Sequence, residues 1–129
     1  KTLLSEWINR GDGHHYVSKR HKDAASILTS EVKEKMKEEA KKLVGKNYDL
    51  TFEWNDDRIY CSELVYKIYH RGAGISVGTL QKLQDFNLSS PVVRAKLKER
   101  YGNNIPLNET VISPGAIFAD SNLVEILSK

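Results

Sequence analysis

The segment from Asp56 to Tyr69 constrains the fold most, because it places the only cysteine of the chain where a helix should begin. The i, i+3, i+4, i+7 spacing of one helical face is occupied by Cys61, Leu64, Val65 and Ile68. The polar residues in front of this stripe predict a turn that leads into the helix. The sequence therefore predicts an amphipathic helix whose apolar face begins with Cys61.

A sulfur in the first turn of a helix lies near the positive end of the helix dipole, beside N–H groups without intrahelical partners. This environment favours the thiolate over the thiol, and the same N–H groups can stabilise an oxyanion. Cys61 is therefore a candidate nucleophile. The pattern alone leaves an alternative open, since a free cysteine on an apolar stripe is often a small buried hydrophobe.

Size and composition exclude several classes of protein. The 129 residues suffice for a single domain, residues 1–129, and a single cysteine excludes a disulfide within the chain. The net charge of +3 is mild. Acid and base alternate in the predicted helix 30–44, so its basic residues do not form the segregated surface that binds nucleic acid. No apolar stretch approaches the roughly 18 residues of a membrane span.

Periodicity and turn residues predict a mixed α+β architecture that is richer in helix than in strand. Thr29 or Ser30 is expected to cap the helix that runs to residue 44, and Pro91 to start another that Gly102 ends. The remaining expected helices are 3–8, the segment after Cys61 as far as Gly72 or Gly74, 79–86 and a turn at 113–114. The expected strands are 15–20, 50–54 and 123–127.

The phrase Tyr60-Cys61-Ser62-Glu63-Leu64-Val65 resembles the nucleophile helix of the circularly permuted NlpC-type, papain-like cysteine hydrolases, in their YiiX-like branch. Upstream, the segment 45–49 is similar to the family's Gly-Lys-x-Tyr-Asp motif, and residues 52–57 follow it as in those proteins. Downstream, the similarity continues at 81–83, 85–86, 96–102, 105–107 and 113–114. It covers the chain from about Leu4 to the end.

The resemblance implies a circularly permuted papain-like fold of the α+β class. It also implies that Cys61 is the catalytic nucleophile, with its backbone N–H as an oxyanion donor. Tyr60 looks like the tyrosine that relatives carry before the nucleophile, with its hydroxyl near the oxyanion. The alternative for Tyr60 is an aromatic that packs against the preceding segment.

A cysteine hydrolase also needs a base near the sulfur, usually a histidine. His70 lies nine residues along the Cys61 helix, roughly 13 Å away at 1.5 Å per residue. The other histidines, His14, His15 and His21, are not singled out by their spacing. An adventitious metal site and exposed histidines are both open interpretations for them, and no metal or other cofactor is predicted for the site.

In the family, the catalytic histidine precedes the cysteine, on a strand near the start of the domain. By resemblance the chain matches the C-terminal two-thirds of that domain, without the N-terminal strands that carry the base. A missing N-terminal segment that supplies this histidine is therefore the expected partner. The chain is then either a piece of a competent enzyme or an inactive derivative.

The residues near Cys61 in the sequence are expected to have structural roles, and the role of several aromatic residues stays open. Ser62 and Glu63 suit the first turn of a helix, and Asp56 and Asp57 are expected to shape the turn before it. Four aromatic residues could either wall a substrate cleft or belong to the core. These are Tyr48, Trp54, Tyr66 and Tyr69.

The expected function is a thiol-dependent hydrolase that cleaves amide bonds through a Cys61 thioester. By resemblance its substrates are cell-envelope peptides or small amides, and its location is the periplasm or cell envelope. The first alternative is an acyltransferase or lipid esterase of the lecithin:retinol acyltransferase type. The second is a non-catalytic binding module.

Overall fold

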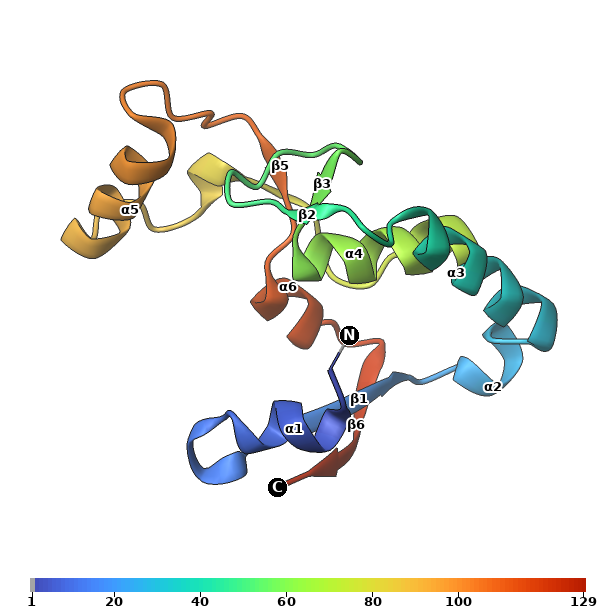
Figure 1. Ribbon diagram of the computed structural model, residues 1–129. Coiled ribbons are helices and arrows are strands. Elements are labelled where there is room, and N and C mark those ends of the chain that lie inside the picture. The colour runs from blue at the N-terminus through green and yellow to red at the C-terminus, as the bar shows by residue number, and fades with distance from the viewer. Residues whose placement is uncertain (1) are drawn as a thin grey trace.

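The computed structural model describes residues 2–129, and their helices and strands confirm the mixed α+β architecture (Figure 1). The helices are α1 (Leu4–Asn9), α2 (Ala24–Ile27), α3 (Ser30–Lys42), α4 (Cys61–Ile68), α5 (Pro91–Tyr101) and α6 (Pro114–Phe118), with short turns η1 (Asp12–His14), η2 (Tyr69–Ala73) and η3 (Leu83–Asp85). The strands are β1 (Val17–His21), β2 (Asn47–Tyr48), β3 (Arg58–Ile59), β4 (Gln81–Lys82), β5 (Thr110–Val111) and β6 (Leu123–Ser128).

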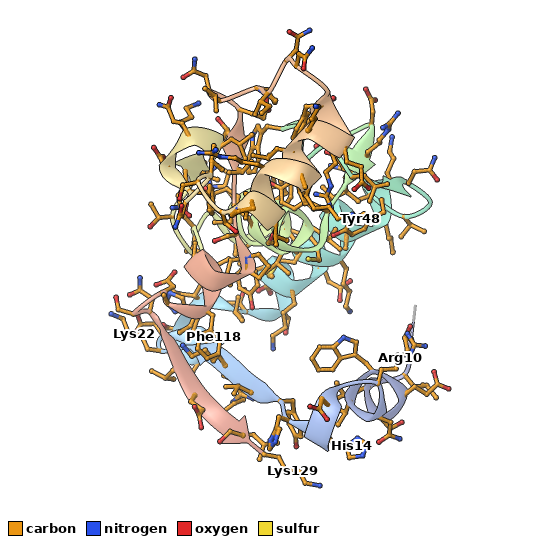
Figure 2. The ribbon with its side chains drawn as sticks, turned by 90° about the vertical axis from the view of Figure 1, so that its left-hand side faces the viewer. Arg10, His14, Lys22, Tyr48, Phe118 and Lys129 are labelled. Carbon is orange, nitrogen blue, oxygen red and sulfur yellow. The ribbon has the colours of Figure 1, made fainter. Side chains whose placement is uncertain are left out.

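The described strands pair two by two. β1 and β6 form an antiparallel ribbon with a register shift between Ser18 and Lys19, β2 and β3 pair in parallel, and β4 and β5 pair antiparallel. Figure 1 shows this ribbon beside α1, with α4 at the centre and α5 at the opposite end. Figure 2 places His14 and Lys129 at the ribbon end of the molecule, away from Tyr48. The strands 15–20 and 123–127 were thus predicted correctly within two residues.

Helix α3 forms where its capping signal predicts. The Val32 N–H donates to Thr29 Oγ1 (3.3 Å), and after the helix Gly45 adopts a left-handed φ of +84°. Helix α3 packs closely against η2, the turn that continues α4, since a Cβ on Gly72 would lie 2.6 Å from the Met36 Cα. Gly72 therefore lets the end of the Cys61 helix approach α3, and Gly74 (φ +69°) ends it.

The core centres on Tyr60, Tyr66 and Ile112. Phe52 meets Tyr60 edge to face (5.2 Å between ring centroids), and Trp54 meets Tyr66 in the same manner (5.7 Å). Trp54 and Tyr66 are therefore core residues, which decides their two interpretations.

The predicted strand 50–54 is wrong. The fully buried Asp49 carboxylate accepts hydrogen bonds from Thr51 N–H (2.8 Å), Thr51 Oγ1 (2.8 Å) and Glu53 N–H (2.6 Å). This side chain takes the backbone donors that a strand would offer to a neighbour, so the segment closes into a loop. The short strand of this region is β2, which lies just before Asp49.

The predicted helix 79–86 is also wrong, because its residues form β4 and the single turn η3. Leu83 N–H donates to Glu109 C=O (3.0 Å), and Gln84 N–H donates to Leu107 C=O (3.0 Å). These long-range bonds from the loop before β5 outcompete the local helix. Helix α2 and the strands β3 and β5 were not predicted at all.

Among residues 2–129, no helix combines the length and apolar character that crossing a bilayer requires.

Candidate active site

Cys61 is the first residue of α4, and its side chain is exposed. The first hydrogen bond of the helix runs from Leu64 N–H to Tyr60 C=O (2.9 Å), so the N–H groups of residues 61–63 precede the intrahelical ladder. The interpretation of Cys61 as a small buried hydrophobe is therefore wrong. The sulfur stands at the positive end of a helix and is open to approach.

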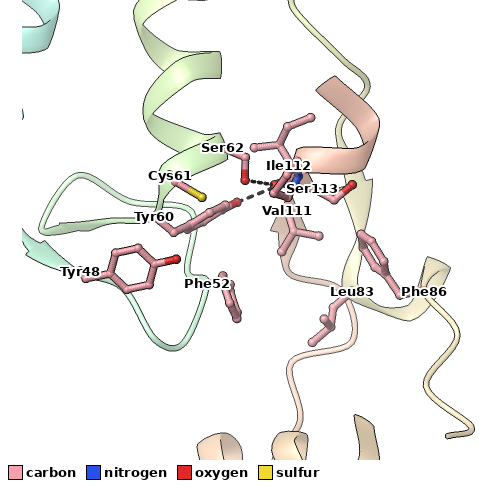
Figure 3. Close-up of a pocket in the computed structure, with 11 residues that line it drawn as sticks. Tyr48, Phe52, Tyr60, Cys61, Ser62, Leu83, Phe86, Val111, Ile112 and Ser113 are labelled. Atoms are coloured by element: carbon pink, nitrogen blue, oxygen red, sulfur yellow. Dashed lines mark hydrogen bonds between the residues drawn. The ribbon is translucent and has the colours of Figure 1, made fainter. Parts of the chain in front are cut away.

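The residues on either side of Cys61 hold the backbone of one buried residue, Ile112. Ile112 N–H donates to the Tyr60 hydroxyl (3.1 Å), and the Ser62 hydroxyl donates to Ile112 C=O (2.7 Å) (Figure 3). Tyr60, Ser62 and Ile112 are all nearly inaccessible to solvent. Cys61 is thus fixed between two residues whose side chains are hydrogen-bonded to the backbone N–H and C=O of Ile112.

A cleft of about 360 Å³ opens beside the sulfur. Figure 3 shows Tyr48 and Phe52 on one side of it and Leu83, Phe86 and Val111 on the other. Its lining is almost entirely apolar: Tyr48, Phe52, Tyr60, Cys61, Ser62, Leu83, Phe86, Val111, Ile112, Ser113 and Pro114. Such a surface favours an apolar group next to the Cys61 sulfur.

Tyr48 lines this cleft beside Cys61 (Figure 3), which decides its two interpretations in favour of the cleft wall. Desolvation of the hydroxyl raises the pKa of Tyr48 above its usual value, and the neighbouring Cys61 sulfur raises it further. The hydroxyl therefore stays protonated at neutral pH and can donate to an anion at the sulfur. Sequence reasoning gave Tyr48 no such role, although its place in the 45–49 motif was visible.

A network of charged side chains, buried at Glu63 and Lys67, supports the start of α4. Lys67 Nζ donates to Glu63 Oε1 (2.5 Å), to Asp56 Oδ1 (2.8 Å) and to the Asn55 carbonyl (2.5 Å). Glu63 Oε2 in turn accepts from the N–H of Tyr60 (3.4 Å), which is the residue before Cys61. Glu63 and Lys67 are 0% and 4% exposed, so this pair is shielded from water.

The pKa values of the two carboxyl groups in this network, Asp56 and Glu63, are shifted in opposite directions. Two guanidinium nitrogens of Arg71 donate hydrogen bonds to the Asp56 carboxylate oxygens (2.7 and 3.0 Å). Together with Lys67 they lower the pKa of Asp56 to about 2. Burial raises the pKa of Glu63, and the hydrogen bond from Lys67 opposes that rise. The predicted structural roles of Asp56 and Glu63 agree with these contacts.

The buried face of α4 differs from the apolar stripe of the sequence. The buried residues are Ser62, Glu63, Tyr66 and Lys67, whereas Cys61 and Val65 are exposed. Polar residues can occupy the interior because Glu63 and Lys67 pair with each other and Ser62 bonds to backbone. The stripe therefore lies along the outward face of the helix.

The histidines of the chain lie elsewhere. His15 Nδ1 contacts the Lys129 carbonyl (3.2 Å), the nearly buried His21 accepts from Asp23 N–H (3.1 Å), and His70 stacks on Tyr66 (5.6 Å). His14 has a left-handed φ of +56° in the turn η1. In the described part of the chain, the cleft beside Cys61 is lined without a histidine.

The histidine, cysteine and carboxylate side chains of residues 2–129 form no group of three that could hold a metal ion. The possible site at His14, His15 and His21 is therefore not assembled by these residues. The described residues thus do not build a metal centre of their own.

Comparison with known proteins places these features in a family. The chain is 49% identical, over 125 residues, to the uncharacterized protein YiiX of Escherichia coli strain K12, and the match covers 97% of this chain and 60% of that protein's length. The crystal structure of metalloprotein yiiX from Escherichia coli O157:H7 superposes with a TM-score of 0.90 at 47% identity, over 99% of this chain and 69% of that one.

The chain thus spans about three-fifths of the length of its curated relative. The family model for the permuted papain-like amidase enzymes matches residues 1–127. This match and the superposition confirm the resemblance seen in the segment around Cys61. The chain belongs to the C92 family of permuted papain-like amidase enzymes, the YaeF/YiiX family.

Proposed function

We propose that the protein containing this chain is a thiol-dependent hydrolase that cleaves amide bonds through a thioester on Cys61. The observation that carries the proposal is the exposed sulfur at the first residue of α4, at the mouth of a cleft of about 360 Å³. A helix N-terminus favours the thiolate, which is the nucleophilic form of cysteine.

In the first step the Cys61 thiolate attacks the amide carbonyl carbon, and a C–S bond forms while the carbonyl oxygen becomes an oxyanion. The C–N bond then breaks, and the amine leaves with a proton from the conjugate acid of the base. In the second step, water loses a proton to the base and attacks the thioester. The C–S bond breaks, which releases the carboxylic acid and restores the thiolate.

Two donors are proposed to stabilise the oxyanion. The Cys61 N–H precedes the intrahelical ladder, and Tyr60 is one of the residues that line the cleft. Because Ile112 N–H occupies a lone pair of that hydroxyl, the Tyr60 oxygen is held in place while its proton can be donated. Burial raises the pKa of Tyr60, so the hydroxyl keeps this proton. We assign Tyr60 and Cys61 as the catalytic residues of the chain.

The base is proposed to come from a segment outside this chain. A groove of about 250 Å³ between the β1–β6 ribbon, α4 and α6 is lined by Val17, Val65 and Phe118, which are 44%, 38% and 54% exposed. Val65 lies one helical turn after Cys61 on the same face of α4. A segment seated in this groove would therefore reach the neighbourhood of the sulfur.

Two substrate classes are consistent with this chemistry. Resemblance supports peptides of the cell envelope, which would place the protein in the periplasm or the envelope. The apolar lining of the cleft supports the second candidate, an acyl-transferring or ester-cleaving enzyme, because it offers no cation to an anionic peptide.

The test compares this chain with an N-terminally extended protein, each as wild type and as Cys61→Ser. Cell-wall peptides and acyl amides or esters serve as substrates, and free imidazole is added to the short chain to replace a missing base. The proposal expects turnover by the extended protein, imidazole-dependent turnover by the short chain and no turnover by either Cys61→Ser variant. A binding module would bind these compounds without turning them over, and that result would refute the proposed enzyme.

A further inference from the structure

A second apolar cavity adjoins the catalytic cleft. It has a volume of about 230 Å³ and lies against helix α5. Its walls are Phe52, Leu83, Val92, Val93, Leu97 and Tyr101, together with the side chains of Lys96 and Arg100. Phe52 and Leu83 line both this cavity and the cleft beside Cys61. These two side chains are therefore the partition between two apolar spaces.

Phe52 is held at this partition by contacts on both sides. Its ring meets Tyr60 edge to face on the side of the cleft, and the Arg100 guanidinium of α5 lies 4.7 Å from the ring centroid on the other. The preceding carbonyl, that of Thr51, accepts a hydrogen bond from the Tyr101 hydroxyl. The loop that carries Phe52 is thus attached both to the core and to α5.

The backbone of Phe52 adopts a left-handed φ of +53°. Bulky residues adopt this conformation rarely, and it persists only where the surrounding structure imposes it. The Asp49 carboxylate imposes it here, since it accepts the N–H groups of Thr51 and Glu53 on either side of Phe52. The strain directs one large aromatic ring into the junction of the two cavities.

The thioester mechanism determines which part of a substrate would meet this junction. The acyl group stays bonded to the sulfur from the first step until water cleaves the thioester, whereas the amine leaves in the first step. The acyl group is therefore the part that must fit beside Cys61. An apolar acyl chain that outgrows the cleft would next meet Phe52 and Leu83, with the second cavity beyond them.

We propose that the second cavity binds the distal end of a long apolar acyl chain, and that Phe52 sets the chain length that the site accepts. This inference rests on the proposed thioester function. With the ring in place, the cleft holds short acyl groups, and a long chain reaches the second cavity by displacing the ring. When the ring is displaced or removed, the cavity beneath α5 adds about 230 Å³ of apolar space. Phe52 is thus a specificity-determining residue.

The experiment measures kcat/KM of the N-terminally extended protein for acyl amides of one fluorogenic amine, with saturated chains of increasing length. Phe52→Ala opens the partition, and Val93→Trp fills the second cavity without touching the cleft. Phe86→Ala is the matched control, because Phe86 lines the cleft alone. Phe52→Leu serves as a second, conservative variant if Phe52→Ala does not fold.

Each buried methylene contributes about fourfold to binding, so changes of at least about tenfold are expected for the longest chains. Phe52→Ala should raise the ratio of long-chain to short-chain kcat/KM, and Val93→Trp should lower it without changing short-chain turnover. If both variants keep the wild-type ratio within twofold, the inference is wrong. Absence of turnover with every chain length would instead overturn the proposed function.

A binding measurement separates the two outcomes. In the Cys61→Ser background, a fluorescent long-chain fatty acid should bind to the otherwise unchanged protein and should lose at least about tenfold in affinity with Val93→Trp. Equal affinity in both proteins would refute the second cavity as a binding site, whatever the catalytic result.

Discussion

Lys67→Met is the substitution whose consequence the structure defines most sharply. Lys67 is 4% exposed, and its ammonium group binds Glu63, Asp56 and the Asn55 carbonyl within 2.8 Å while lying 4.9 Å from the Trp54 ring. Methionine keeps the length of the side chain but has no charge. The variant therefore leaves Glu63, which is fully buried, without its cation.

Removing one partner of a buried ion pair costs about 3–5 kcal/mol, because the remaining charge is left without compensation. For a chain of 129 residues, the midpoint of thermal unfolding should fall by roughly 10–20 °C. The double variant Glu63→Gln/Lys67→Met removes both charges and should lose only about 1–2 kcal/mol. The two substitutions are therefore strongly non-additive.

The loss should also depend on pH. Burial already raises the pKa of Glu63 in the wild type, and Lys67 opposes this rise. Without Lys67, the folded-state pKa of Glu63 rises further above its unfolded value of about 4.3. The folded variant then holds a proton that the unfolded chain releases, so its deficit should shrink as the pH falls toward that unfolded value.

Urea unfolding at pH 7.5 and 5.5 measures these differences, with the wild type at each pH as reference. Lys37→Met is the matched control, since Lys37 also pairs with a glutamate at 2.5 Å but is 63% exposed, and it should leave the unfolding midpoint unchanged. If Lys67→Met destabilises the protein no more than this control, or equally at both pH values, the buried pair does not support α4 as described.

Three further results are expected. Asp49→Ala removes three hydrogen bonds from the loop around Phe52 and should lower the free energy of unfolding by roughly 2–4 kcal/mol. Urea titrations measure this change, and an unchanged free energy of unfolding would contradict the role of the Asp49 carboxylate. The pKa of Asp56 is lowered to about 2 in the folded protein, against an unfolded value of about 3.9. Its contribution to stability is therefore complete above about pH 3.9 and is lost as the pH falls through about 2. Asp56→Asn should remove this part of the acid dependence of the unfolding midpoint. Iodoacetamide should alkylate Cys61 in the native protein within about tenfold of the rate in urea, whereas a rate slower by a factor of a thousand would mean a buried thiol.

Local signals in the sequence predicted the elements that depend on local chemistry. The Thr29 cap and the glycine at position 45 define α3, Pro91 and Gly102 define α5, and Ser113 caps α6 by accepting from Ala116 N–H (3.0 Å). The position of Cys61 at a helix start follows from the same kind of signal. These features need no long-range contact, so a single sequence contains enough information to predict them.

Long-range polar contacts decided what the pattern could not predict. The apolar spacing of α4 indicated one face, but the buried face carries Glu63 and Lys67, whose i, i+4 pairing was visible in the sequence without its burial. Likewise, the β-forming residues after Asp49 lose their donors to one carboxylate. The placement of Tyr48 beside Cys61 depends on the parallel pairing of β2 with β3, which no local pattern indicates.

Trapping of the covalent intermediate tests the central claim most directly. The N-terminally extended protein is mixed with an acyl amide, quenched in acid at successive times and mapped by mass spectrometry. The account predicts that the peptide containing Cys61 gains the mass of the acyl group, that the adduct decays as the free acid accumulates, and that Cys61→Ser gives neither. Product formed at an undiminished rate by Cys61→Ser would contradict the assignment of Cys61 as the nucleophile.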